Sequence, residues 1–538
     1  MTAPIMDHFD PLRVSIAPGI TLVEASAGTG KTFAITRLVL RLLLQREAPL
    51  ALREIAVVTF TEKGTNELIT RIREVLRLAR DICSDDPPLG DRHRDLVAFL
   101  RPQREWATER IGEALAAIDQ LSVSTIHGFC RRILSELALE AGVHFDLEFL
   151  ENDTALLTRA AHDWARRTLV TDLAPAELVG ASGVDPATWA RALVQPADSH
   201  PVIDARHGDA LGATLLADYI TSVQTGARRE RNQRHALSFD DLLRRLSHVL
   251  TSEGPQGPLA QRIRQRFRTA LIDEFQDTDP FQFPIFRNAF AGCPLFLIGD
   301  PKQSIYAFRG ADVRAYLSAA ASATQRFTLG VNYRSTPELV EAVQTLFAHH
   351  PSTPFGASLG ITFPAIRSAD RATRPAALAT DGRRALHWIV VRDDRPAKVL
   401  KKGTAKPKPL SKDDGMRTAI DATIRELLTL RANGLEAKAM AILVRGNRQA
   451  QEMKHALDRV GVPAVVTSDH DVLDSDEGEE LIRIALAIAE PGNDQRIRAA
   501  LATRLWGATA TDIVRMLQGD GHQEWATVIS TVRSAHEI

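Results

Sequence analysis

The chain has 538 residues, of which 44% are hydrophobic and 25% are charged, so it can build several folded domains and is not a disordered chain. Its 66 lysines and arginines balance its 67 aspartates and glutamates, and this neutrality neither supports nor excludes a nucleic-acid partner. Three widely separated cysteines, Cys83, Cys130 and Cys293, argue against a disulfide framework or a zinc site and favour a reducing compartment, the cytoplasm.

The N-terminal segment MTAPIMDHFDPLR has no apolar core, so no signal peptide is expected. Beyond it, apolar runs alternate with segments of helical period, and the run at 38–44 is too short to span a membrane. Most of the apolar runs are continuous, as in parallel strands buried on both faces, which predicts an α/β fold with doubly wound domains. Strands are predicted at 20–26, 55–61, 269–275, 295–300, 385–391 and 439–445, and helices at 33–45 and 67–78.

Two segments interrupt this alternation. Residues 151–235 carry long helical patterns and end in a basic stretch, which predicts a mainly helical insertion. Residues 398–415 are rich in lysine and proline, which predicts a solvated loop, with a DNA contact as the alternative.

The first of these strands leads into a loop that can bind phosphate. Gly28 and Gly30 let the backbone turn tightly, so that its N–H groups and the next helix N-terminus face phosphate oxygens. Lys31 is predicted to reach the β- and γ-phosphates of ATP, and Thr32 to ligate Mg²⁺. The predicted nucleotide-binding residues are Ala25, Ser26, Ala27, Gly28, Thr29, Gly30, Lys31 and Thr32.

Two adjacent carboxylates end the strand predicted at 269–275. In P-loop enzymes an acidic residue at this place holds Mg²⁺ beside the phosphates, which is the role predicted for Asp273. Glu274 is placed to polarise the attacking water as a general base. Asp277 and Asp279 can instead cap the next helix, because Pro280 suits a first helical turn.

Five ordered motifs place this P-loop chain closer to one family. They are VVTFTEKGTNELITRI (57–72), STIHGFCRRIL (124–134), DEFQDTD (273–279), LIGDPKQSIYAFRGAD (297–312) and LGVNYRS (329–335). The sequences and the order of these motifs resemble those of the UvrD/Rep superfamily 1 DNA helicases. The strings FDPLR, IHGFC and SFDDLL resemble the RecB (exodeoxyribonuclease V beta subunit) branch. The resemblance covers essentially the whole chain.

The resemblance implies two RecA-like motor domains, the second of them incomplete. Residues 1–150 and 236–326 are expected to form the first motor domain around the helical insertion at 151–235. Residues 327–490 are expected to belong to the second motor domain, and 491–538 to begin a helical insertion within it. The family's later motifs, of the types TxHxxKGLE and VALTR, and a nuclease motif are not recognised. The chain is therefore expected to be a fragment, a split gene product or a truncated sequence.

The resemblance also implies roles for residues around ATP. Gln303 resembles the γ-phosphate sensor, and Gln276 resembles a residue that links the nucleotide to the attacking water, with Asp300 supporting the same network. Arg334 resembles an arginine finger, projected by the second motor domain, that neutralises charge on the transferring phosphoryl group; the alternative is a salt-bridged surface arginine. The first glutamine of the chain, Gln45, follows the phosphate loop, so the usual glutamine that reads adenine is missing and adenine recognition stays open.

A surface for single-stranded DNA is implied as well. Tyr306 and Phe308 lie two residues apart beside Arg309, and they can stack on bases unless both belong to the core. Lys63 either contacts phosphate or is simply solvated. The positions that match the strand-lining residues of the family are Thr59, Phe60, Thr61 and His127, the last of which is otherwise a structural histidine.

The resemblance implies an ATP- and Mg²⁺-dependent 3′-to-5′ DNA helicase subunit of a RecBCD-like complex, acting on DNA ends in recombinational repair. The implied partners are single-stranded and duplex-end DNA and RecC-like and RecD-like subunits. One alternative is a catalytically incomplete module that binds DNA or docks subunits in a nucleotide-dependent way. An unrelated P-loop ATPase is a further alternative.

Overall fold

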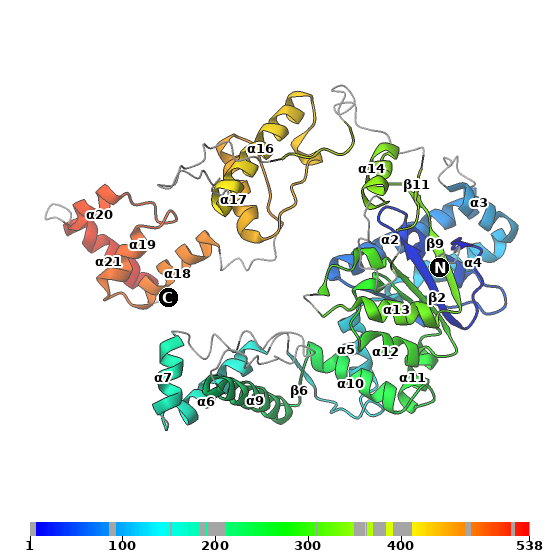
Figure 1. Cartoon of the computed structure of the whole chain (residues 1–538), viewed down its shortest axis with the longest axis horizontal. Coiled ribbons are helices and arrows are strands. Elements are labelled where there is room, and N and C mark those ends of the chain that lie inside the picture. Colours follow the sequence, from blue (N-terminus) through cyan, green and yellow to red (C-terminus); the bar gives the residue numbers. More distant parts are fainter. Residues whose placement is uncertain are drawn as a thin grey trace, which may run out of the picture. The chain divides into compact units, whose positions relative to one another are not determined.

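The computed structural model describes residues 7–85, 93–150, 153–171, 173–182, 190, 210–307, 310–348, 361, 363–369, 384–390, 411–467, 475–517 and 522–536. The predicted DNA-contact residues Phe308 and Arg309 lie outside these ranges, as does most of the loop predicted at 398–415. The described residues fall into two compact units (Figure 1). The first contains those up to Arg374 together with Arg384–Leu386, and the second contains those from His387 onward.

The first unit is built on a seven-stranded parallel sheet, which confirms the predicted α/β class. Its strand order is β1-β9-β2-β8-β7-β3-β4. The predicted strands at 20–26, 55–61, 269–275 and 295–300 are all present, each slightly displaced or shortened. The seven strands are β1 (Asp7–His8), β2 (Gly19–Ala25), β3 (Ile55–Thr59), β4 (Ser122–Thr125), β7 (Thr269–Ile272), β8 (Pro294–Gly299) and β9 (Gln325–Leu329).

Helices cover both faces of this sheet, and alternate strand residues point into two separate cores (Figure 1). Val23 of β2 joins the core on one face and its neighbour Leu22 joins the core on the other. The first face is covered by α1 (Lys31–Leu43), α2 (Glu62–Asp85), α3 (Arg94–Leu100) and α4 (Arg104–Ala116). The second face is covered by α5 (Ile126–Glu136), α10 (Phe239–Ser252), α11 (Pro258–Arg266), α12 (Gln282–Ala289) and α13 (Val313–Ser322). Both predicted helices are found, as α1 and within α2.

The parallel arrangement decides where a site can form. Because all seven strands run the same way, the chain leaves β2, β3, β7, β8 and β9 at one edge of the sheet. Ligands of open α/β sheets bind outside this carboxyl edge. The predicted nucleotide and DNA residues lie at or just after the ends of these five strands, except His127, which follows β4, so the topology brings distant sequence segments to one edge.

A separate helical bundle interrupts the first unit. It contains α6 (Thr154–Leu169), α7 (Leu173–Ser182) and α9 (Ala210–Gln233), with a small core of its own around Trp164. The chain enters it through β5 (Glu148–Leu150) and leaves through β6 (Ala236–Ser238), and these two short strands pair in parallel. The described part of the expected insertion at 151–235 is thus helical.

The boundary expected at residue 326 falls inside β9, a strand of the main sheet. After β9 the first unit continues with β10 (Val331–Asn332), α14 (Pro337–Ala348) and β11 (Arg367–Ser368). Residues 331–335 therefore follow a strand of the first unit directly.

The second unit is described as helices. They are α16 (Lys412–Ala432), α17 (Asn447–Arg459), α18 (Asp476–Ala489), α19 (Asp494–Leu501), α20 (Ala510–Leu517) and α21 (His522–His536). One core joins α16 to α17, and another joins α18, α19 and α21. Among the described helices of the whole chain, none is both long enough and apolar enough to cross a membrane.

Two strand predictions are wrong within the described residues. Residues 385–390 and 439–445 form no strand, and Leu443 is 96% exposed. An apolar run predicts burial, but a strand also needs a neighbouring strand to satisfy its N–H and C=O groups. The described part of the second unit supplies no such neighbour.

Candidate functional site

The phosphate loop joins β2 to α1 at the carboxyl edge of the sheet. Gly28 and Gly30 have φ angles of 77° and 93°, a region that side chains with a Cβ disfavour, and Gly30 caps the N-terminus of α1. The Thr29 hydroxyl donates a 2.7 Å hydrogen bond to the Ser26 carbonyl, which closes the turn. The first N–H groups of α1, from Lys31 onward, therefore open onto the loop and can bind an anion.

The acidic end of β7 meets this loop. The Lys31 ammonium forms an ion pair with the Glu274 carboxylate, although the two residues lie 243 positions apart. Glu274 has a left-handed backbone with φ of 51°, which turns the chain sharply away from the sheet. The Asp273 N–H donates a 2.7 Å bond to the Val58 carbonyl of β3, which fixes the start of this turn. The structure thus brings together three residues predicted to act on ATP.

This corner carries more negative than positive charge. Burial, and after it the Glu274 charge, raise the pKa of Asp273 to about 7, although Lys31 opposes the shift. The same two causes raise the pKa of Asp277 to about 6. One oxygen of Asp277 is buried with no hydrogen-bond partner among the described residues. A divalent cation would neutralise this excess, and the Thr32 hydroxyl and the Asp273 carboxylate are oxygen ligands of the kind that Mg²⁺ prefers.

A chain of hydrogen bonds links Glu274 to the residue predicted to sense the γ-phosphate. The Gln276 side-chain amide donates to the Glu274 carboxylate at 2.8 Å, and its oxygen accepts the Asp300 N–H at 2.9 Å. The Asp300 carboxylate in turn accepts the Gln303 amide at 2.7 Å. Gln276 and Asp300 are buried, so this network is rigidly held. Gln303 therefore meets the Lys31 corner through two intermediates rather than by direct contact.

The segment predicted to carry the arginine finger packs against the phosphate loop. The Asn332 amide donates to the Ala27 carbonyl at 2.9 Å, and the Tyr333 N–H donates to the Gly28 carbonyl at 2.9 Å. The Asn332 oxygen accepts the Arg334 N–H at 2.9 Å, which holds the turn. Arg334 is exposed and its backbone lies beside the loop within the first unit. Asn332 was not predicted as a site residue, although it stands in the NYRS string.

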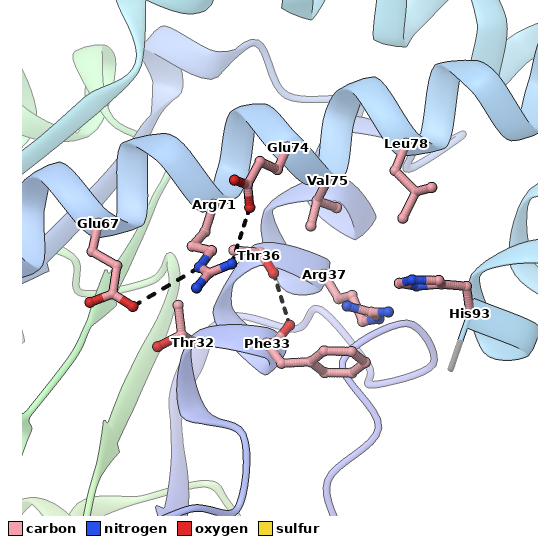
Figure 2. A pocket seen from close by; sticks show the side chains of 10 residues that line it. All are labelled: Thr32, Phe33, Thr36, Arg37, Glu67, Arg71, Glu74, Val75, Leu78 and His93. Carbon is pink, nitrogen blue, oxygen red and sulfur yellow. Dashed lines mark hydrogen bonds and ion pairs between the residues drawn. The ribbon is translucent and has the colours of Figure 1, made fainter. Parts of the chain in front are cut away.

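A cavity of about 380 Å³ opens between α1 and α2, beside the predicted magnesium ligand Thr32 (Figure 2). Figure 2 shows the Arg37 guanidinium next to the Phe33 ring, 3.1 Å from its centroid, and Arg37 also donates to Asp95 at 2.9 Å. Arg71 pairs with Glu74 at 3.2 Å along α2, on one wall of the cavity. The lining residues are Thr32, Phe33, Thr36, Arg37, Glu67, Arg71, Glu74, Val75, Leu78 and His93.

The predicted DNA residues divide into two groups. The Phe60 and Tyr306 rings face each other with centroids 5.0 Å apart, so the ends of β3 and β8 together present an aromatic pair. Thr59, in contrast, is only 3% exposed, so its side chain is not available to a DNA strand. The Thr61 hydroxyl is used at the start of α2, where it accepts the Gly64 N–H at 3.0 Å.

A second aromatic contact lies at the start of α5. The His127 ring meets Phe239 edge to face, with centroids 5.2 Å apart, and Phe239 is 41% exposed. Phe239 was not predicted as a site residue because it begins α10, more than 100 residues after His127. The SFDDLL string that contains it was the available signal.

Two family models match the chain. Residues 12–324 match the model of the UvrD/REP helicase N-terminal domain, and residues 327–517 match that of the UvrD-like helicase C-terminal domain.

Individual relatives agree with these family matches. The chain is 32% identical over 528 residues to the RecBCD enzyme subunit RecB of Mycobacterium tuberculosis H37Rv, covering 94% of this chain and 46% of the relative. It is 29% identical over 671 residues to RecB of Escherichia coli K12, covering 99% and 55%. The chain spans about half the length of the curated relatives it matches.

Proposed function

The chain belongs to the UvrD/Rep family of DNA helicases, and from this membership we propose that it is the ATP-hydrolysing, DNA-translocating subunit of a RecBCD-type enzyme. The observation that carries the proposal is the meeting of Lys31 with Glu274 beside the buried Asp273, on the edge where the phosphate loop opens. Motor ATPases need a phosphate-binding cation, a metal-binding carboxylate and a water-polarising carboxylate at one point.

The residues of the corner have separable tasks. Phosphate oxygens compete with Glu274 for the Lys31 ammonium, so a bound triphosphate draws Lys31 away and leaves the Glu274 carboxylate to polarise water. Thr32 and Asp273 would hold Mg²⁺, which would neutralise charge on the phosphates. Arg334, exposed beside the loop, supplies further positive charge to the transferring phosphoryl group.

Two aromatic rings offer a way to hold the adenine. Phe33 lies in the first turn of α1, and Tyr333 is 58% exposed while its backbone bonds to the phosphate loop. Flat exposed rings bind a base by stacking, which needs no glutamine. We expect Phe33→Ala to raise the KM for ATP several-fold with little change in kcat, and an unchanged KM would remove Phe33 from the adenine site.

The DNA strand is proposed to cross the same edge. The pairs Phe60–Tyr306 and His127–Phe239 offer faces on which bases can stack without regard to sequence. Movement would follow from the hydrogen-bonded chain that links Gln303, three residues before Tyr306, with Glu274 at the phosphate loop.

The finer assignment extends what the relatives' names say. We propose 3′-to-5′ movement, action on DNA ends in recombinational repair, RecC-like and RecD-like partner subunits and a cytoplasmic location. The proposal of two RecA-like motor domains, the second beginning near residue 327, accompanies this assignment. The alternative is a nucleotide-dependent DNA-binding or docking module without turnover, and the exposed apolar side chains of the second unit are the observation in its favour.

DNA-stimulated ATP hydrolysis separates the two functions. The motor proposal predicts phosphate release that rises with single-stranded DNA in the wild type and is abolished in Lys31→Ala. If both proteins release phosphate at the same rate while both bind DNA, the chain is a binding module and not a motor.

A further inference from the structure

Lys302, Glu24 and Asp300 form a buried cluster of charged side chains next to Gln303, the predicted γ-phosphate sensor. The Lys302 side chain is only 5% exposed, and its ammonium lies 2.8 Å from a Glu24 carboxylate oxygen and 2.6 Å from an Asp300 carboxylate oxygen. Glu24 belongs to β2, the strand that enters the phosphate loop, whereas Asp300 follows β8. Lys302 therefore ties two neighbouring strands together where each one ends.

Asp300 connects this charged cluster to Gln303 and Gln276, the residues predicted to act near the γ-phosphate. One of its oxygens accepts both the Lys302 ammonium and the Lys302 N–H, the latter at 3.1 Å. Its other oxygen accepts the Gln303 amide at 2.7 Å, and its N–H donates to Gln276 at 2.9 Å. The contacts with Lys302 thus fix the orientation of the Asp300 carboxylate, and the Asp300 carboxylate in turn orients the Gln303 side chain.

The charges explain why Lys302 cannot be replaced by an apolar side chain without consequence. Burial alone lowers the pKa of Lys302, but the Asp300 and Glu24 charges raise it by more, so the ammonium stays protonated. Removing that charge would leave two buried carboxylates facing each other, and a buried charge without its partner is strongly unfavourable. One carboxylate would then move or take a proton, and Asp300 is the one that holds Gln303.

We propose that Lys302 is a positioning residue for the γ-phosphate sensor, which locks Asp300 and Gln303 to the strand that enters the phosphate loop. This inference rests on the proposed function, because it assigns Lys302 a part in ATP turnover. When a bound triphosphate shifts the phosphate loop, Asp300 and Gln303 move with it as one rigid group. Gln303 is three residues before Tyr306 of the aromatic pair.

Lys302→Met tests this role, because methionine keeps most of the aliphatic side chain and removes the charge. We expect kcat of the DNA-stimulated ATPase to fall by at least about 10-fold while the KM for ATP stays within about 3-fold, since Lys302 touches no substrate. Affinity for single-stranded DNA without nucleotide should be unchanged. The effect of a non-hydrolysable ATP analogue on that affinity should be lost.

Two variants control for a merely structural effect. Arg231→Met breaks another cluster of one cation and two carboxylates, which is partly buried, since Arg231 pairs with Asp153 and with Asp241 at the base of the helical insertion. It should lower the melting temperature about as much as Lys302→Met but leave kcat within about twofold. Tyr316→Phe removes a buried hydroxyl that has no hydrogen-bond partner among the described residues, next to the same charges, and should change neither quantity.

The proposal is overturned if Lys302→Met keeps kcat within about twofold of wild type, or if Arg231→Met loses as much kcat for the same loss of melting temperature. Should the wild type hydrolyse no ATP, the proposed function fails, and hydrogen exchange of the peptide 300–306 then decides the point. Lys302→Met should accelerate exchange there by at least about 10-fold relative to wild type and to Arg231→Met. Unchanged exchange would show that Lys302 does not hold the sensor.

Discussion

Glu274 has a strained backbone conformation and carries the carboxylate that is predicted to act as the general base. Its left-handed backbone costs on the order of 1 kcal/mol for a residue with a Cβ. The turn is held because the Asp277 N–H donates to the Glu274 carbonyl at 3.0 Å and the carboxylate binds Lys31 and Gln276. Strain that the surroundings enforce in this way is common at functional sites.

Replacing Glu274 by glutamine should separate binding from hydrolysis. Glutamine keeps the size of the side chain but cannot accept a proton, so kcat for ATP should fall by roughly 10²–10⁴-fold. The KM for ATP should change little, because the phosphate contacts of Lys31 remain. Steady-state phosphate release at saturating single-stranded DNA measures both constants, and a loss confined to KM would argue against the general-base role.

Asp273 should destabilise the metal-free protein at neutral pH. Its pKa in the folded protein, about 7, lies above the usual value of 3.8, so its neutral form is favoured by folding. The resulting penalty is absent below about pH 4, grows as the pH rises and levels off above about pH 7. Asp273→Asn should therefore raise the free energy of unfolding by on the order of 2 kcal/mol at pH 8 and by clearly less at pH 5.

Urea unfolding in EDTA at pH 5, 6, 7 and 8 checks this expectation. The same substitution should abolish Mg²⁺-dependent ATP hydrolysis, so stability and activity change in opposite directions. A difference in stability that is independent of pH would mean that Asp273 is not an uncompensated buried carboxylate.

The aromatic pair gives a prediction for DNA alone. Replacing both Phe60 and Tyr306 by alanine should weaken single-stranded DNA binding by about 10-fold or more, since each stacked base contributes about 1–3 kcal/mol. Fluorescence anisotropy with a labelled oligonucleotide measures the affinity. Phe33→Ala is the matched control, because it removes an exposed ring beside the phosphate loop and should leave DNA affinity unchanged.

Individual residues differed in how far the sequence could predict them. Lys31 and Glu274 were found because their chemistry needs fixed neighbours along the chain, a glycine loop or a strand end. Asn332, Lys302 and Phe239 were missed, because their partners lie far away in sequence. Only the fold reveals which carbonyl, carboxylate or ring each one meets.

At the level of elements, the contact between the phosphate loop and the turn after β10 is the tightest constraint. A Cβ added at Gly28 would lie 2.8 Å from the Arg334 Cβ and 3.0 Å from the Asn332 amide. At Gly30 an added Cβ would meet only Phe33, at 3.7 Å. Both glycines have positive φ angles, so the two positions differ mainly in this packing.

Gly28→Ala should therefore be more harmful than Gly30→Ala. We expect the free energy of unfolding to fall by about 1–3 kcal/mol more for Gly28→Ala, because the turn must move to admit the methyl group. Thermal or urea unfolding of the two variants side by side measures the difference. Equal losses would indicate that the turn does not press on the loop.

Elements were predicted well where local pattern and tertiary setting agree. The strands at 20–26, 55–61, 269–275 and 295–300 are mostly apolar and lie inside a parallel sheet covered on both faces. The runs at 385–391 and 439–445 have the same pattern, yet their described residues have no strand beside them. Hydrophobic periodicity indicates which side chains are expected to be buried, but it does not indicate whether a neighbouring strand is available for pairing.

At the scale of the whole molecule, the described ATP-site residues all belong to the first compact unit. They follow four strands of one parallel sheet, β2, β7, β8 and β9, and their convergence follows from the strand order rather than from any local motif. Topology of this kind is beyond what periodicity in a single sequence can predict. The family resemblance implied it, and the matches to both UvrD-like domains support that inference.

The account depends on one triphosphate meeting these residues together. The most direct measurement is a crystal structure of the chain with Mg²⁺ and a non-hydrolysable ATP analogue. We predict the γ-phosphate within hydrogen-bond distance of Lys31 and Gln303, Mg²⁺ bound by Thr32 and Asp273, and Glu274 released from Lys31. A nucleotide bound elsewhere, or a loop that stays closed by the Lys31–Glu274 ion pair with the analogue present, would contradict it.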